Sequence, residues 1–389
     1  MSWDSIEFPK AIRKTKIGRN QQILSADIRK TGRFPVVDQG QEFIAGYSDE
    51  EHKVIRDELP LVIFGDHTRC VKYVDFPFII GADGTKVLKP DTELFDPRFF
   101  YYAVLGLNVS NRGYNRHFTL LKEKSLPRPE KDEQRKVTAV LGLVQRAIEQ
   151  QERLIAVTTE LKKALLHKLF TEGLRGEPQK QTEIGPMPES WDTVRLGEVC
   201  ALGTGTTPPT AHPEYYNGDV PFVKTADIVN NRIRISQTNV SHEAIKDCGL
   251  KLYPPGTVLM AMYGQGKTRG QVSLLEIPAA TSQNAAAIQP STEINSEFLW
   301  QYLMSRYQLL RGSGALGHIS HLNLGYVRDF QIPKPPIVIQ CEVAEILRTI
   351  DNRLTLLESR KCVLNDLFRT LLHQLMTAQI RVDKLVLLE

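Results

Sequence analysis

Two short polar segments carry side chains able to contact nucleic acid, and each follows an apolar run. His67 and Arg69 come directly after Leu61–Phe64 in the first half of the chain. In the second half, an apolar run ending at Met262 leads into a segment with Tyr263, Gln265, Lys267 and Arg269. Cationic side chains bind phosphates or guanine edges, and a glutamine amide pairs with adenine. Both segments therefore predict DNA contacts, and an ordinary solvated hairpin loop is the alternative for the second.

Further polar clusters follow in each half. Residues 111–117 read Asn-Arg-Gly-Tyr-Asn-Arg-His, so that Arg112, Tyr114, Asn115 and Arg116 fall within seven residues. The second half has His318-Ile319-Ser320-His321 in the equivalent place. One more pair of loops carries Lys86 in the first half and Gln283-Asn284 in the second. The cluster at residues 111–117 holds more polar side chains than a solvated turn usually carries, which favours DNA contact.

Catalytic and nucleotide-binding alternatives have weaker support. Residues 261–268 match a relaxed phosphate-binding loop, Ala-x-x-x-x-Gly-Lys-Thr, but a genuine one opens a helix, whereas the residues up to Pro278 indicate a turn into a strand. Asp66-His67 is a candidate metal site or acid/base pair, but no third ligand lies nearby in the sequence. His167 and His373 predict packing or capping near helix ends. Because methyltransferase, nucleophile-elbow and clustered metal motifs are missing, we expect no catalytic residue and no metal site.

Composition narrows the class of protein. The 389 residues carry a formal net charge of +4, which is compatible with DNA binding and argues for little more. The five cysteines are scattered without a C-x-x-C pair, as expected for a reducing cytoplasm. No apolar run approaches the roughly 18 residues that a spanning helix needs, and the N-terminus lacks a leader pattern. We therefore expect a cytoplasmic protein that stays off the membrane.

An internal repeat organises the elements that must position these loops. Residues 126–175 align without a gap to residues 332–381, at a constant offset of 206. The identical pairs include Pro127/Pro333, Pro129/Pro335, Gln134/Gln340, Val137/Val343, Leu141/Leu347, Glu152/Glu358, Leu161/Leu367, Leu165/Leu371, His167/His373 and Leu169/Leu375. A fixed register over so long a stretch indicates a fixed helical geometry.

Each copy predicts one long amphipathic helix that begins after a Pro-x-Pro. Apolar residues recur every three or four positions, as an apolar seam for lengthwise pairing requires. The predicted seam includes Val137, Leu141, Val144, Ile148, Ile155, Leu161, Leu165 and Leu169 in the first copy. About 40 residues give a rod of roughly 60 Å. Two unrelated helices, each packed on its own domain, are the alternative.

The predicted order along the chain is therefore globular domain, long helix, linker, globular domain and long helix, and we expect an α+β fold. Both globules open near a Trp-Asp pair and carry an apolar strand, polar loops and an aromatic helix-like segment before the rod. The predicted bounds are 1–128 and 190–334 for the globular domains, 129–175 and 335–381 for the helices, and 176–189 for a Gly/Pro-containing linker.

This arrangement resembles the specificity subunit of type I restriction-modification systems. The resemblance rests on the doubled globule and helix, on Leu-Pro-Arg-Pro-x-x-x-x-Gln and Ile-Pro-Lys-Pro-x-x-x-x-Gln at the helix entrances, and on segments 34–40, 64–67, 191–199, 203–208, 220–224 and 281–283. It implies two target-recognition domains joined by two long antiparallel helices that form a coiled coil. Each domain would read one half of a bipartite asymmetric site in double-stranded DNA.

The resemblance also implies partners and adds candidate residues. Two methylation subunits, which use S-adenosylmethionine, would dock on the helices, and restriction subunits that use ATP would join through them; Mg is expected on these partners, and no cofactor on this chain. The full set of candidate DNA-binding residues is Gln39, Gln41, His67, Arg69, Lys86, Arg112, Tyr114, Asn115, Arg116, Thr206, Lys224, Tyr263, Gln265, Lys267, Arg269, Gln283, Asn284, His318 and Ser320. A structural adaptor with two protein-binding domains on a coiled-coil rod is the alternative function.

Overall fold

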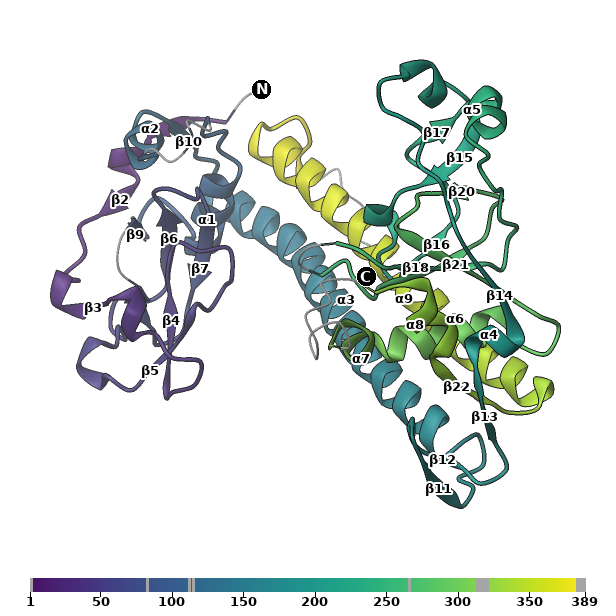
Figure 1. Cartoon of the computed structure of the whole chain (residues 1–389). Coiled ribbons are helices and arrows are strands. Elements are labelled where there is room, and N and C mark those ends of the chain that lie inside the picture. The colour runs from purple at the N-terminus through teal and green to yellow at the C-terminus, as the bar shows by residue number, and fades with distance from the viewer. Residues whose placement is uncertain are drawn as a thin grey trace. The chain divides into compact units, whose positions relative to one another are not determined.

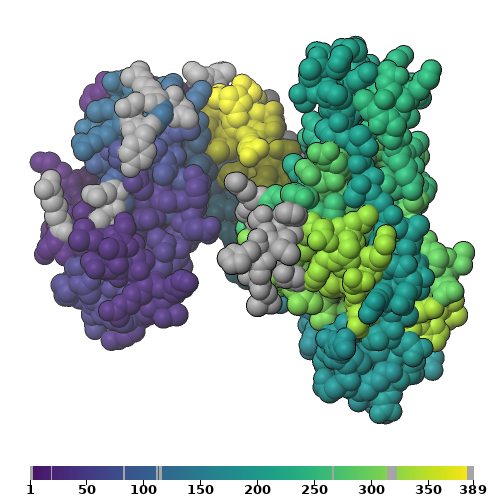
Figure 2. Space-filling model, in the orientation of Figure 1, coloured from purple at the N-terminus to yellow at the C-terminus, as the bar shows by residue number. Residues whose placement is uncertain are grey.

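The computed structural model describes residues 3–81, 84–110, 113, 116–264, 267–312 and 322–382. The chain forms two compact units, residues 1–152 with 359–389 and residues 153–358. The two globular parts, purple to blue and teal to green by residue number, are each built from one stretch of the chain (Figures 1 and 2). The long helices α3 (Lys131–Thr171) and α9 (Ile337–Met376) each contribute residues to both units.

The globular part of the first unit contains two four-stranded sheets, ordered β2-β9-β6-β7 and β3-β8-β4-β5, and the pair β1-β10. The strands are β1 Ser5–Glu7, β2 Ile12–Arg13, β3 Gln22–Ile23, β4 Phe34–Val37, β5 Gly46–Ser48, β6 Leu61–Gly65, β7 Val71–Val74, β8 Ile79–Gly81, β9 Thr85–Pro90 and β10 Ser125–Pro127. The α-helices α1 (Pro97–Leu105) and α2 (Phe118–Lys122) follow the sheets, and short 3-10 turns lie at Phe8–Lys10, Arg19–Gln21, Ser25–Asp27 and Glu51–Lys53.

The second unit repeats this plan with a five-stranded sheet, β14-β21-β18-β19-β16, the three-stranded sheet β17-β15-β20, and the pairs β13-β22 and β11-β12. The strands are β11 Gln179–Thr182, β12 Gly185–Pro188, β13 Asp192–Arg195, β14 Cys200–Thr204, β15 Val220–Val223, β16 Arg232–Ile233, β17 Asn239–Val240, β18 Val258–Ala261, β19 Val272–Leu275, β20 Ala280–Thr281, β21 Ala285–Pro290 and β22 Gln331–Lys334. The helices are α4 Leu196–Val199, α5 His242–Asp247, α6 Ser296–Ser305, α7 Tyr307–Gly312 and α8 Leu324–Asp329, with 3-10 turns at Pro213–Tyr216 and Thr225–Asp227.

Strand pairing gives both globular parts the same central motif. Strand β6 lies between β7 and β9 and is antiparallel to both, and β18 lies in the same way between β19 and β21. A parallel pair accompanies each motif, β4 with β8 and β15 with β20. The predicted α+β class and the common scaffold of the two globules agree with this topology, although the loop sequences differ.

Both long helices complete the core of each unit. In the first unit the buried helix residues are Val137, Val140 and Leu141 of α3 and Leu372, Leu375 and Met376 of α9, packed beneath α1. In the second unit they are Leu169 and Phe170 of α3 and Val343, Ala344 and Leu347 of α9, beside Trp191 and α6. The start of α3 thus shares a core with the end of α9, and the end of α3 with the start of α9. Within each unit the two helices run in opposite directions.

One position of the predicted apolar seam is wrong in both copies. Leu161 and Leu367 are 51% and 43% exposed, whereas the neighbouring Lys162 and Phe368 turn inward. A helix turns by about 100° per residue, so Leu161, six residues after Ile155, points well away from the stripe, whereas Lys162, seven residues after Ile155, lies on it. The apolar character of the two leucines therefore misled the prediction, because each stands one position before the residue that lies on the stripe.

Residues 176–189, predicted as a linker, form the antiparallel hairpin β11–β12 next to the end of α3 (Figure 1). Met187 of this hairpin is 1% exposed and belongs to the core of the second unit. Gly173, Gly176 and Gly185 have positive φ and supply the turns that fold the segment back. Glycine and proline marked tight turns here rather than a free connection.

No helix within the described residues is long and apolar enough to span a lipid bilayer.

Candidate nucleic-acid interface

The candidate residues of the first globular part gather at one edge of its sheets. Strands β4, β6 and β8 end at this edge and β7 and β9 begin there, which brings together loops far apart in sequence. The His67 backbone N–H donates to Gln39 Oε1 at 3.1 Å, and the Thr68 hydroxyl donates to the Gln39 carbonyl. Arg69 donates to the Val109 carbonyl at 3.0 Å. The loops that carry Gln39, His67 and Arg69 therefore form one surface.

Asp66 is buried under this surface and bonds to the segment at the start of α2. Its carboxylate, 2% exposed as a residue, accepts the Phe118 N–H at 2.8 Å and lies 3.6 Å from Lys86 Nζ. Its carbonyl accepts the His117 N–H at 2.8 Å. The carboxylate is thereby committed to the entrance of α2, which is a structural role rather than acid/base chemistry. Within the described residues no group of three or more His, Cys, Asp or Glu side chains is arranged to hold a metal ion.

The candidate residues of the first part fall into different environments. Gln41 and Arg116 are exposed at the edge, as is Arg69, whose backbone adopts φ 62°. Gln39 and Lys86 are half-buried, and their hydrogen bond and ion pair tie them to the neighbouring loop. Arg112, Tyr114 and Asn115 lie outside the described residues.

The second globular part assembles the equivalent edge. The Gln283 N–H donates to Thr207 Oγ1 at 3.4 Å, and the Met262 N–H donates to the Asn284 carbonyl at 3.0 Å. The chain also crosses very closely at Gly205, because a Cβ there would lie 1.6 Å from the Thr281 carbonyl oxygen. Only glycine permits this approach, which sets Thr206 beside the 281–284 loop. Thr206, Lys224 and Gln283 are exposed, and Asn284 is half-buried.

The segment after β18 packs on α7. The Tyr307 hydroxyl donates to the Lys267 carbonyl at 2.6 Å, and Arg269 donates to the Arg311 carbonyl at 2.7 Å. Tyr263 and Lys267 are exposed, whereas Arg269 is half-buried. Strand β19 follows this segment, so the helix that a phosphate-binding loop requires is replaced by a strand, as the sequence indicated. Gln265, His318 and Ser320 lie outside the described residues.

A glutamine clasp that the sequence reasoning did not assign attaches each globular part to its long helix. Gln134, at the start of α3, donates to the carbonyls of Leu94 (3.0 Å) and Pro129 (2.9 Å) and accepts the Asp96 N–H at 2.7 Å. Asp96 in turn caps the N-terminus of α1. The clasp therefore links the helix entrance to the first globular part.

Gln340, at the start of α9, forms the same three bonds. It donates to the carbonyls of Glu293 (3.0 Å) and Pro335 (2.8 Å) and accepts the N–H of Asn295 (2.8 Å), the N-cap of α6. Both glutamines are buried. The signal in the sequence was that they are an identical pair of the repeat and end the Pro-x-Pro-x-x-x-x-Gln motif at each helix entrance.

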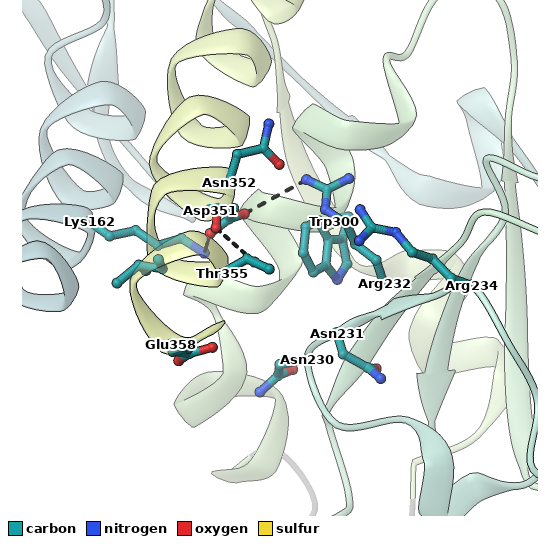
Figure 3. Close-up of a pocket in the computed structure, with 11 residues that line it drawn as sticks. Lys162, Asn230, Asn231, Arg232, Arg234, Trp300, Asp351, Asn352, Thr355 and Glu358 are labelled. Atoms are coloured by element: carbon teal, nitrogen blue, oxygen red, sulfur yellow. Dashed lines mark hydrogen bonds and ion pairs between the residues drawn. The ribbon is translucent and has the colours of Figure 1, made fainter. Parts of the chain in front are cut away.

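A charged junction deeper in the second unit joins its globular part to both helices. Asp351 of α9 lies 2.6 Å from Lys162 Nζ of α3 and accepts from Gln301 Nε2 of α6 at 2.6 Å. Arg232 of β16 lies 3.8 Å from the same carboxylate. Figure 3 shows Lys162, Asp351 and Arg232 turned toward one another at a cavity of about 360 Å³.

Arg232 is held from several sides at this charged junction. Its guanidinium donates to both carboxylate oxygens of Glu297, at 2.6 and 2.5 Å, and to Glu276 at 3.2 Å, and it stacks 4.8 Å from the Trp300 ring centroid. Burial acts to lower the pKa of Arg232, but the hydrogen bonds and negative charges of Glu297, Glu276 and Asp351 together outweigh it and raise the pKa above its usual value. The arginine therefore stays charged and bridges the sheet, α6 and α9.

The first unit has a neutral junction at the corresponding place. Gln145, 206 residues before Asp351, accepts from the Tyr102 hydroxyl at 2.9 Å. Phe368, 206 residues after Lys162, lies beside the Tyr102 ring with centroids 6.1 Å apart. Burial raises the pKa of Tyr102 to about 12, so the hydroxyl stays protonated and donates. One position in the fold thus holds an ionic contact in one unit and an aromatic, neutral contact in the other.

Comparison with known proteins adds family information to this geometry. Residues 188–365 match the model of the type I restriction modification DNA specificity domain. The type I restriction enzyme EcoR124I/EcoR124II specificity subunit of Escherichia coli is 24% identical over 343 residues, which are 85% of this chain and 82% of that subunit. The MjaIX specificity subunit of Methanocaldococcus jannaschii is 28% identical over 201 residues, and the match spans only 50% of this chain and 45% of that subunit.

Solved structures of low sequence identity share the fold. The S subunit of a type I restriction-modification system from M. genitalium matches with a TM-score of 0.61 at 17% identity, over 96% of this chain and 94% of that one. A chain from a structural study of complex assembly and conformational transition in the type I R-M system matches with a TM-score of 0.56 at 18% identity, over 97% and 98%. These matches confirm the predicted class of fold, two globular parts joined through long helices. The chain is therefore similar over most of its length to specificity subunits of type I restriction-modification systems, and its residues 188–365 match their DNA specificity domain.

Proposed function

We propose that this chain reads a bipartite, asymmetric site in double-stranded DNA, one half with each globular part, and performs no catalysis itself. The observation that carries the proposal is the repeated edge: in both globular parts, loops distant in sequence converge beside the same central strand and present Gln, Lys and Arg side chains. Amides and cations at a loop edge suit base edges and phosphates.

The helices complete the proposal. Each globular part is attached to α3 and α9 by a buried glutamine clasp and a second junction, and a rigid attachment would fix the unread spacing between the half-sites. Two globular parts that each bind DNA weakly gain affinity from a rigid link only when the spacing of the half-sites matches the distance between the two parts. Two methylation subunits would dock on the helices, with restriction subunits joining through them, in the cytoplasm. S-adenosylmethionine, ATP and Mg would bind to these partners and not to this chain. The predicted domain bounds remain predictions within this scheme.

Alanine substitutions in each reading edge test the proposal. With the methylation partner present and the site taken from methylome sequencing, Gln41→Ala and Arg116→Ala should weaken binding through the first half-site, and Lys267→Ala and Gln283→Ala through the second. Each loss should be about 1–3 kcal/mol. Gel-shift titrations at fixed salt measure it, and Arg195→Ala, an exposed cation on β13, is the control.

A structural adaptor predicts a different outcome. Without phosphate contacts there is no counterion release, so binding would not depend on salt in the manner of a DNA-binding protein. Equal affinity for all duplexes at moderate salt, unchanged by the four substitutions, would contradict sequence reading and favour the adaptor.

A further inference from the structure

A lysine in the middle of β7 is buried in the first globular part. Lys72 is 5% exposed, between Val71 and Tyr73 on a strand that pairs with β6. Lysine is almost never buried without partners, because its ammonium loses hydration there. The partners of Lys72 therefore indicate what the residue does.

The ammonium of Lys72 closes the base of a loop. Nζ donates to the Asp38 carbonyl at 2.9 Å and to the Glu42 carbonyl at 2.5 Å, and lies 3.6 Å from the Asp38 carboxylate. These two carbonyls stand at the two ends of residues 38–42, which follow β4. A single cation with three donors thus ties both ends of the segment to the sheet.

The loop tied down in this way carries two candidate base-reading amides. Gln41 is exposed, and Gln39 is fixed from the other side by the His67 N–H. The Asp38 carboxylate also accepts the Gly40 N–H at 2.8 Å, which tightens the turn. Lys72 itself lies beneath the loop, so its effect on any DNA contact passes through the position of Gln39 and Gln41.

Fold stability does not explain the lysine. Burial lowers the pKa of Lys72 despite the nearby Asp38, Cys70 and Glu42, so the ammonium is held there against its solvation preference. The strand topology does not require a lysine at this position either. Lys72 pairs with Ile63 on the central strand β6, and Ser273 pairs with Leu259 on β18, at the equivalent place in the second globular part. There a serine hydroxyl, bonded to Asn231 at 2.6 Å, takes the position.

We propose that Lys72 is a positioning residue that sets the sequence selectivity of the first recognition domain by fixing the loop 38–42. The inference rests on the proposed function and narrows it, because it assigns selectivity at one half-site to a side chain that does not touch the DNA.

The test is Lys72→Met in the full chain with its methylation partner. Methionine fills a similar volume without donors, so the loop loses its tie while the strand stays packed. Duplex libraries that vary each half-site separately should show discrimination at the first half-site reduced about tenfold, with the second half-site unchanged. Amide hydrogen exchange in residues 38–42 should become faster, and the melting temperature should stay equal or rise.

Two further variants make the result decisive. Lys72→Arg keeps a charged donor and should restore part of the lost discrimination. Lys89 lies on strand β9 and forms an ion pair with Glu58 at 3.1 Å. Lys89→Met breaks this ion pair and should leave the discrimination at both half-sites as in the unsubstituted chain. If Lys72→Met discriminates normally, or loses both half-sites equally with a lower melting temperature, the inference is overturned. If the unsubstituted chain selects no split site, the proposed function fails instead.

Discussion

At the scale of single residues, buried polar side chains decide how the recognition parts are attached. Gln134 and Gln340 are themselves buried, and each bonds to two carbonyls and one N–H of the neighbouring backbone. A buried polar group left without its partner loses its hydration with no compensation. The clasp glutamines therefore stabilise the structure chiefly by supplying hydrogen-bond partners to these backbone groups.

Gln340→Ala should lower the free energy of unfolding by about 1–3 kcal/mol, because it leaves the Asn295 N–H and the carbonyls of Glu293 and Pro335 unsatisfied. Gln134→Ala should behave alike in the first unit. Urea unfolding followed by circular dichroism measures the change. Gln150→Ala, on the exposed face of α3, should shift stability by less than about 0.5 kcal/mol. Equal effects of the buried and exposed substitutions would show that the clasp contributes nothing.

At the scale of elements, the two junctions between helices and globular parts use different chemistry at equivalent positions. Lys162 and Asp351 make the second junction ionic, and Phe368 and Gln145 make the first neutral. Removal of one partner from a buried, hydrogen-bonded ion pair lowers the free energy of unfolding more than the same removal from an exposed pair, because the remaining charge is left buried without a partner. The second unit should therefore depend on its charges in a way that the first does not.

Asp351→Asn tests this dependence. The substitution removes the carboxylate shared by Lys162 and Gln301 and should destabilise the second unit by about 1–3 kcal/mol. Hydrogen exchange resolved by peptide should show the loss in α6 and β16 and not in α1. Asn352→Ala, the exposed neighbour on the same helix, serves as the control. Uniform loosening of both units would argue against a local ionic junction.

At the scale of the whole molecule, the proposed function treats α3 and α9 as a ruler. In the first unit Lys361 lies 2.8 Å from Glu152, so Glu152 and Lys361 mark facing positions on the two helices. Seven residues add two helical turns and preserve the facing stripe to a good approximation. They add about 10 Å, the length of about three base pairs.

Insertion of seven residues after Glu152 together with seven before Lys361 should therefore lengthen the preferred spacer by about three base pairs. Methylome sequencing of cells that carry the altered chain with its partners reads the spacer directly. Four residues inserted in one helix alone should misalign the pair and either alter the preferred spacer or abolish assembly. An unchanged spacer in the seven-residue variant would remove the ruler from the proposal.

The sequence by itself determined the features that repeat along the chain. The 206-residue offset indicated both long helices, the Pro-x-Pro entrances marked their beginnings, and the order of motifs gave the resemblance to type I specificity subunits, because helical periodicity and turn chemistry are local properties of the chain. Only the tertiary structure decided which loops meet, why Asp66 anchors α2, and that Lys72 ties down residues 38–42. These contacts join segments some thirty to fifty residues apart through the strand order, and burial of a lysine within a β-strand is invisible until that order is known.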